Sequence, residues 1–174
     1  MIDLKLVVVE DDELLLKRIT KILKREISEV SPFNNPTEAL EHILEIKPDI
    51  IISDINMPGM SGLEMYKKLQ DKDINIPIIL TSAFSEPKYF IDAIKLKVKN
   101  FIVKPIEVDN LLKEIHNFND ELEQKKELTK KEHLLRIKSK MAAMGEMLEN
   151  IAHHRFANLL CLQTDYHCLQ YKVL

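Results

Sequence analysis

The chain has 174 residues, of which 45% are hydrophobic and 30% charged, and its formal net charge is −3. This composition is typical of a soluble protein with one full domain and an appendage. The slightly acidic balance gives no reason to expect nucleic acid as a partner. No apolar run approaches the roughly 18 residues that a membrane span needs, and the N-terminus does not resemble a signal peptide.

The cysteines and glycines exclude two further classes of protein. Cys161 and Cys168 are the only cysteines. On one helix they would lie about 10 Å apart, which is too far for a disulfide within the chain. The three glycines form no glycine-rich phosphate loop. We therefore expect a reduced, cytoplasmic protein without a nucleotide-binding domain.

Residues 1–118 alternate short apolar runs with helical patterns. Strands are expected at residues 4–9, weakly around Val30, and at 49–55, 76–82 and 100–104. Apolar residues at helical spacing predict helices at 14–23, 39–44, 63–69 and 89–96, and from about Val108. Strands that are near-continuous Val and Ile runs are typical of a parallel sheet buried on both faces. The pattern predicts an α/β fold with a doubly wound five-stranded parallel sheet.

The composition changes after residue 118. Residues 119–140 are charged, mixed in sign and free of glycine and proline, which predicts a helical linker. From Ile137 an apolar pattern with 3–4 spacing returns and predicts a long coiled-coil-like helix over residues 141–174. Such a helix cannot bury its apolar stripe alone. We expect it to form a homodimer or to pack back on the first domain.

Charged and hydroxyl side chains follow the ends of the predicted strands, where a doubly wound sheet binds its ligands. In chain order they are Glu10, Asp11, Asp12, Asp54, Thr81, Ser82 and Lys104. Clustered carboxylates cannot all stay ionised without a cation, and oxygen ligands suit Mg²⁺. Lys104 and a hydroxyl supply partners for a phosphate. The pattern therefore indicates a phosphoryl group held on a carboxylate, with Asp54 as the nucleophile.

These residues also have ordinary structural explanations. Asp12 could cap the first predicted helix, and Ser61 could cap the third. Lys104 could be a surface charge. Any one of these residues alone would be weak evidence for a site, and the case depends on their order and spacing together.

The segments "VVEDD", "SDINMPGMSGLE", "LTSAF" and "FIVKPI" match a known family in order and spacing. Residues 3–118 resemble the receiver domain of two-component response regulators. The resemblance implies the strand order 2-1-3-4-5. It also implies a phosphorelay function, with a cognate histidine kinase or phosphotransfer protein as partner. A receiver of this kind phosphorylates itself from a phosphodonor and loses the phosphoryl group slowly, without an ATP-binding domain.

The resemblance also implies roles for individual residues at the acidic end of the sheet. Asp54 resembles the phosphoacceptor, and Asp11 and Asp12 resemble its partners in the Mg²⁺ site. Asn56 would contribute its backbone carbonyl to the metal.

A second set of roles concerns the switch. Ser82, which Ala83 follows, resembles the switch hydroxyl, and Phe101 resembles the aromatic residue coupled to it. Lys104 resembles the phosphate-binding lysine, and Pro105 a cis proline. Phosphorylation would draw Ser82 toward the phosphoryl oxygens and turn Phe101 inward.

This chain departs from the family pattern at two positions. Lys97 stands where the family usually has glycine, which predicts a strained residue at positive φ. Phe101 lacks a hydroxyl group, so any switching motion there depends on packing alone.

A second resemblance begins in the C-terminal part of the chain. "KMAAMGEMLENIAHH" is similar to the start of a histidine-kinase dimerisation helix, and it aligns His153 with the phosphorylated histidine. The residues after His153 do not match, and no ATP-binding domain follows. His153 is therefore either a phosphoacceptor or an idle remnant. His153, His154 and Cys161 are also candidates for a metal site, although no fourth ligand is evident.

Two alternative functions follow from this segment. The chain could be a truncated receiver–histidine kinase hybrid in which His153 also exchanges phosphate. It could also be a dimerisation module without catalytic activity.

Overall fold

The computed structural model describes residues 1–83, 91 and 93–170, with side chains described as far as residue 148. Residues 91 and 93–95 are helical, and the rest of the helix predicted at 89–96 falls largely outside the described part of the chain. The elements in chain order are β1 (Ile2–Val9), α1 (Glu13–Leu23), β2 (Ile27–Phe33), α2 (Pro36–Ile46), β3 (Ile50–Asp54), α3 (Gly62–Gln70), β4 (Ile78–Ala83), β5 (Asn100–Lys104) and α5 (Val108–Gln170).

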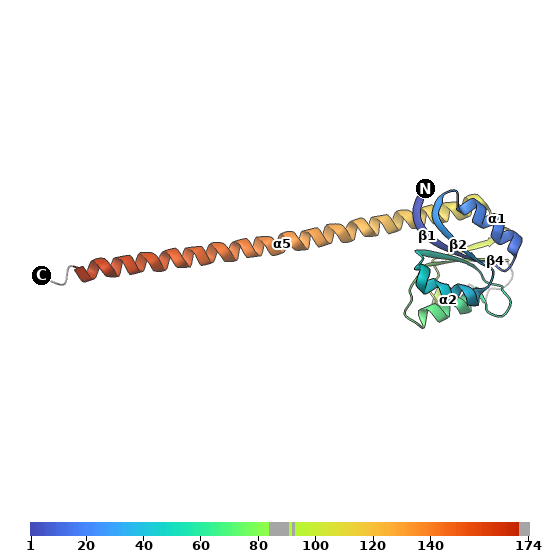
Figure 1. Cartoon of the computed structure of the whole chain (residues 1–174), viewed down its shortest axis with the longest axis horizontal. Coiled ribbons are helices and arrows are strands. Elements are labelled where there is room, and N and C mark those ends of the chain that lie inside the picture. The colour runs from blue at the N-terminus through green and yellow to red at the C-terminus, as the bar shows by residue number, and fades with distance from the viewer. Residues whose placement is uncertain (84–90, 92, 171–174) are drawn as a thin grey trace. The chain divides into compact units, whose positions relative to one another are not determined.

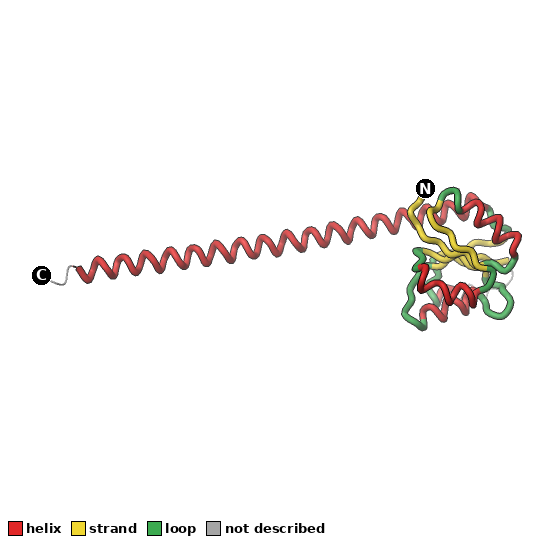
Figure 2. Tube along the Cα trace, viewed as in Figure 1, coloured by secondary structure: helices red, strands yellow, loops and turns green. Residues whose placement is uncertain are grey.

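The five strands form one parallel sheet in the order β2-β1-β3-β4-β5. This confirms the predicted fold. β1 lies next to both β2 and β3, and β3 lies in the middle of the sheet between β1 and β4. Since all strands run the same way, their carboxyl ends meet at one rim of the sheet. Figure 2 shows the strands in yellow with helices around them.

Both faces of the sheet are covered, and α1 and α2 lie on opposite sides of it (Figure 1). Side chains of successive strand residues point to opposite faces. On one face, Val7 and Val9 of β1 pack in a core with residues of α2 and α3. Helices α1 and α5 bury residues spaced three and four apart, as an amphipathic helix does. These residues are Leu16, Ile19 and Leu23 in α1, and Leu111, Ile115 and Phe118 in α5.

β2 is a seven-residue strand and therefore longer than its weak sequence pattern indicated. It stands at the edge of the sheet, where it pairs only with β1. An edge strand keeps part of its surface in solvent, so its sequence carries polar residues. It also tolerates Pro32, because a proline lacks the N–H group that a central strand would need.

Side chains cap the first three helices. Asp12 caps α1, and Asn35 caps α2. Ser61 forms a capping box with Glu64 at the start of α3. Each cap satisfies backbone N–H groups that the helix itself leaves free. The caps fix where each helix begins after the loop at the rim of the sheet.

The chain divides into two compact units, Met1–Asp120 and Glu121–Leu174. In the second unit α5 continues to Gln170, drawn as one red helix in Figure 2. Apolar side chains along this segment are exposed: Leu134, Leu135, Ile137, Met141, Met144, Met147 and Leu148. No helix in the described part of the chain is long and apolar enough to cross a membrane.

Candidate functional site

Asp54 is the last residue of β3 and is buried at the carboxyl end of the central strand. Its Oδ1 accepts a hydrogen bond of 2.8 Å from the backbone amide of Ile55. Its backbone carbonyl accepts a hydrogen bond of 2.9 Å from Ser53 Oγ and lies against Gly62. A Cβ atom on Gly62 would stand only 2.2 Å from that carbonyl oxygen. The backbone around Asp54 is therefore tightly held.

Lys104 ends β5 and connects two carboxylates at the same rim. Its Nζ donates to Asp54 Oδ2 at 2.7 Å and to both carboxylate oxygens of Glu10 at 2.9 Å. All three side chains are largely buried, with exposed fractions of 21% for Lys104, 7% for Asp54 and 4% for Glu10. Hydrogen bonds between charged groups at such distances are strong. Lys104 thus offsets the electrostatic repulsion between the two buried carboxylates.

Burial shifts the proton affinity of this group of residues. Desolvation raises the pKa of Glu10 above its ordinary value of 4.5, although the hydrogen bond from Lys104 acts in the opposite direction. Burial alone would lower the pKa of Lys104, but its hydrogen bonds to Asp54 and Glu10 raise it above 10.5. Lys104 therefore stays charged, while Glu10 gains a proton more easily than a solvated glutamate does.

Three carboxylates could hold a metal ion here. Oxygen atoms of Glu10, Asp11 and Asp54 all lie within 4.8 Å of one another. Asp11 is exposed, so the group opens to solvent on one side, while Glu10 and Asp54 are buried. A set of carboxylate oxygens at a wet rim fits a hard divalent cation such as Mg²⁺.

Asp12 has a different position from the one that the resemblance implied. Its Oδ1 accepts hydrogen bonds from the amides of Leu14 and Leu15, at 2.9 and 3.1 Å, and so caps α1. Glu10 takes its place in the acidic group. The sequence places Glu10 at the end of the first predicted strand, but the resemblance implies no metal role for it. The signal that favours it is its position directly after the buried run of β1.

The remaining residues predicted for the metal site and the switch lie close to this rim. Asn56 is exposed in the turn after β3, two residues beyond Asp54. Thr81 pairs in register with Asp54, and Ser82 follows it along β4. Ser82 is buried, and its Oγ donates to the carbonyl of Ala83 at 3.0 Å. In this structure the hydroxyl of Ser82 is thus directed along its own strand.

β5 contributes the other switch residue and the proline. Phe101 is half-buried and packs against the core on the α2 and α3 face. The Lys104–Pro105 peptide bond is cis, as the resemblance implies. Lys97, in the turn before β5, has a φ of 55°, which is the left-handed conformation predicted for it.

The predicted phosphohistidine belongs to the second unit. His153 lies in the helical backbone of α5, but its side chain falls outside the described residues, as do those of His154 and Cys161. The alternatives for this segment therefore stay predictions.

Comparison with known proteins identifies the first unit. A sequence profile described as the response regulator receiver domain matches residues 6–116. The chemotaxis protein CheY of Listeria monocytogenes serovar 1/2a is 38% identical over 110 residues, which make up 63% of this chain and 92% of that protein. The chemotaxis protein CheY of Thermotoga maritima is 34% identical over 114 residues, covering 64% of this chain and 95% of that protein.

A solved structure is also similar to this chain. The N-terminal domain of an uncharacterized protein (WS1339) from Wolinella succinogenes superimposes with a TM-score of 0.67 at 36% identity, covering 70% of this chain and 98% of that chain. The profile match spans more than half of the chain, and it includes Glu10, Asp54 and Lys104. The chain therefore belongs to the response regulator receiver domain family.

Proposed function

We propose that this receiver domain takes part in a phosphorelay by accepting a phosphoryl group on Asp54. The observation that carries the proposal is the ion pair between Lys104 and Asp54, beside the carboxylates of Glu10 and Asp11. The amide of Ile55 holds Oδ1, and Lys104 holds Oδ2.

The proposed donor is a phosphohistidine on a cognate histidine kinase or phosphotransfer protein, or a small phosphodonor. A carboxylate oxygen of Asp54 attacks phosphorus, and the bond from phosphorus to the imidazole nitrogen breaks as the new P–O bond forms. The imidazole nitrogen keeps the electron pair of that bond. Lys104 passes from the carboxylate to the phosphoryl oxygens, where its charge stabilises the transferring group.

A divalent cation fits this chemistry. Glu10, Asp11 and Asp54 would hold Mg²⁺, with the backbone carbonyl of Asn56 as a further oxygen ligand. When bound, the ion supplies positive charge to the phosphoryl oxygens and lets three acids stay ionised together. The proposal does not include Asp12 among the metal ligands, because its Oδ1 caps α1.

The proposed switch involves Ser82 and Phe101. In the described state the Ser82 hydroxyl donates to Ala83 O, so it must exchange this partner to reach a phosphoryl oxygen. A new charged acceptor favours the exchange, because hydrogen bonds to charged groups are stronger than neutral ones. Phe101 is packed against the core and would move by repacking alone.

The output that we propose is the pairing of the second unit with a second copy of the chain. Leu134, Ile137, Met141, Met144 and Leu148 follow one another at alternating spacings of three and four, as the a and d positions of a coiled coil do. All five are exposed in the single chain. Exposed apolar stripes of this kind are stabilised when a second helix covers them.

Mass spectrometry tests the phosphorylation. After incubation with acetyl phosphate and Mg²⁺, we expect the intact protein to gain the mass of one phosphoryl group. The Asp54→Asn variant should gain none. Label retained on Asp54→Asn would disprove the assignment of this residue. If neither protein gained mass from acetyl phosphate or from a phosphorylated kinase, the chain would be a dimerisation module without phosphotransfer.

A further inference from the structure

A pocket lies away from the acidic group, at the edge of the sheet formed by β2. This pocket of about 670 Å³ is formed by α1, the end of β2 and the first turn of α2. Its lining residues do not include Glu10, Asp11 or Asp54. Small-molecule sites in proteins typically enclose about 300–1,000 Å³. The pocket is therefore large enough for a ligand of its own.

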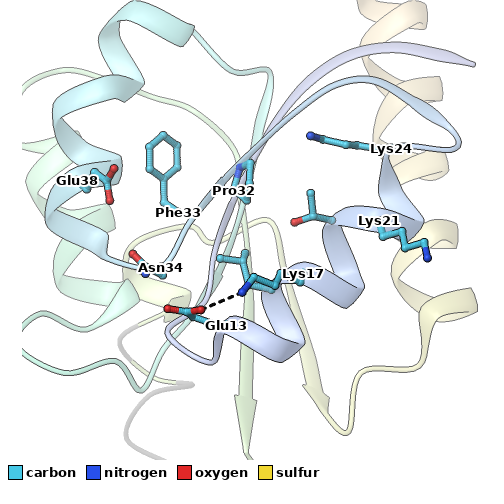
Figure 3. Close-up of a pocket in the computed structure, with 10 residues that line it drawn as sticks. Glu13, Lys17, Lys21, Lys24, Pro32, Phe33, Asn34 and Glu38 are labelled. Atoms are coloured by element: carbon cyan, nitrogen blue, oxygen red, sulfur yellow. Dashed lines mark hydrogen bonds and ion pairs between the residues drawn. The ribbon is translucent and has the colours of Figure 1, made fainter.

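The pocket combines an apolar wall with charges at its mouth. Leu16, Pro32 and Phe33 contribute apolar surface, and Phe33 is only half-buried. At one end Lys17 pairs with Glu13, with Nζ and Oε2 3.0 Å apart. This pair is drawn as a dashed line in Figure 3. The charge of Lys17 is therefore already compensated within the pocket.

Lys24 provides a cation that is not compensated in this way. Figure 3 shows its side chain extending from the end of α1 toward Pro32, whereas Lys21 turns outward. Within the described residues, the ammonium of Lys24 has no hydrogen bond or ion pair. An anionic group of a ligand bound beside Pro32 could therefore form an ion pair with Lys24.

Thr20 adds a second polar group that lacks a partner. It lines the pocket and is 8% exposed, and its Oγ1 has no hydrogen-bond partner among the described residues. A buried hydroxyl without a partner costs about 1–3 kcal/mol. Threonine in a helix uses two χ1 rotamers, so the hydroxyl can turn toward a ligand. A bound molecule with a polar atom at this wall would remove that cost.

The edge of β2 argues against an extended peptide as the occupant. The carbonyl of Phe33 accepts from Glu10 N at 3.0 Å, so the peptide groups of Phe33 face β1. Those of Pro32, the preceding residue, face the open edge, because neighbouring residues of a strand alternate. Proline has no N–H group to offer there. A strand added beside the pocket would lack a hydrogen bond at this point.

We propose that this pocket binds a small organic anion. The ligand would place a flat apolar group against Phe33 and Pro32, and its carboxylate, sulfonate or phosphate group near Lys24. The hydroxyl of Thr20 would then bind a polar atom of the same molecule. The proposal is independent of phosphorylation at Asp54, because the two sites share no residues.

The test uses the full chain and anilinonaphthalene sulfonate, which has an aromatic body and one anionic group. In amide NMR spectra of isotope-labelled protein, we expect this probe to shift the signals of Leu16, Thr20 and Phe33. Phenylnaphthylamine, which has the aromatic body without the sulfonate, should bind more weakly. Lys24→Gln should weaken probe binding by about threefold or more, since one exposed charge contributes up to about a fivefold effect.

Arg18→Gln is the control, because it removes one positive charge from the same helix at an exposed residue that does not line the pocket. It should reduce affinity by less than half as much as Lys24→Gln does. Equal effects of the two variants would reduce the proposal to general charge attraction and overturn it. Probe-induced shifts confined to residues 134–148, or equal binding of phenylnaphthylamine, would also overturn it. A hexaglutamate peptide that shifted the NMR signal of Lys24 without shifting that of Phe33 would overturn the proposal as well. The site would then bind acidic peptides.

Discussion

Lys104 Nζ lies 2.7 Å from Asp54 Oδ2 and 2.9 Å from the carboxylate of Glu10, so one ammonium group connects the ends of three strands. β5 stands at one edge of the sheet, and β1 and β3 lie further in. The ion pair therefore spans the rim of the sheet above β4. It has both a structural role, as a neutralising charge, and the proposed role in phosphoryl transfer.

Lys104→Met should destabilise the protein by about 2–3 kcal/mol, because removing one partner of a largely buried pair leaves the other charges uncompensated. Urea unfolding measures this loss. Addition of Mg²⁺ should restore part of the stability if Glu10, Asp11 and Asp54 bind the ion. Lys17→Met is the control, since its ion pair with Glu13 is exposed and should contribute less than about 1 kcal/mol. Equal losses in the two variants would contradict a special role for Lys104.

Glu10 should make stability depend on pH. Burial raises the pKa of Glu10 in the folded state above its ordinary value of 4.5. Between 4.5 and the raised value the folded protein holds more protons than the unfolded chain. The contribution of Glu10 to stability must therefore fall as pH rises through this window.

Glu10→Gln removes this titration. We expect the unfolding free energy of the wild type, relative to that of Glu10→Gln, to decrease as pH rises above 4.5. Urea unfolding at a series of pH values, with a metal chelator present, measures the difference. If the unfolding free energies of the two proteins changed with pH in the same way, Glu10 would have the same pKa in the folded and unfolded states. That result would contradict the prediction.

Gly62→Ala should weaken the support of Asp54. The new Cβ would stand 2.2 Å from Asp54 O and 2.7 Å from Ser53 Oγ. Because neither the strand end nor the start of α3 can move freely, we expect a loss of about 1–3 kcal/mol. Urea unfolding would measure it, with a change in the amide signal of Asp54 as a second readout.

Gly145→Ala is the matched control, because nothing lies within 4 Å of the Cβ position there. Alanine in a helix is favoured over glycine by up to about 1 kcal/mol. This variant should therefore gain helix content by circular dichroism. If Gly62→Ala were as stable as the wild type, the loop after β3 would be able to move and accommodate the new Cβ, which would contradict the prediction.

Met144→Lys tests the proposed pairing of the second unit. Met144 lies in the apolar stripe between Met141 and Leu148, so a charge there should raise the dissociation constant of the dimer at least about tenfold. Sedimentation equilibrium measures this constant. Leu135→Lys introduces the same charge at an exposed position outside the stripe and should leave it nearly unchanged. A monomeric wild-type chain would contradict the proposal directly.

The sequence predicted the sheet because its inner strands are continuous runs of buried residues. β2 was harder to recognise, since an edge strand needs fewer apolar residues and accepts Pro32. Asp54 and Lys104 were found because each ends such a run. Lys97 could be predicted to adopt positive φ only through the resemblance, as nothing in its own chemistry favours that conformation.

The sequence alone does not show whether Glu10 or Asp12 joins the acidic group with Asp11 and Asp54. Three consecutive acids follow β1, and their directions depend on where the strand ends and the helix begins. Because Asp12 becomes the cap of α1, its carboxylate is used by backbone amides. The pocket beside Phe33 could not be predicted either. The pocket depends on how α1 and α2 pack on the two sides of an edge strand. Local sequence patterns do not predict this packing.

The place of β1 between β2 and β3 has a consequence for synthesis of the chain. The unit from β1 to β2 can form as soon as residue 33 has left the ribosome, and it then covers one edge of β1. The other edge stays unpaired until β3 follows, about twenty residues later at a rate of roughly 5–20 residues per second. Nascent chains that stall in this interval expose an open strand edge, and should be the ones that aggregate or recruit chaperones.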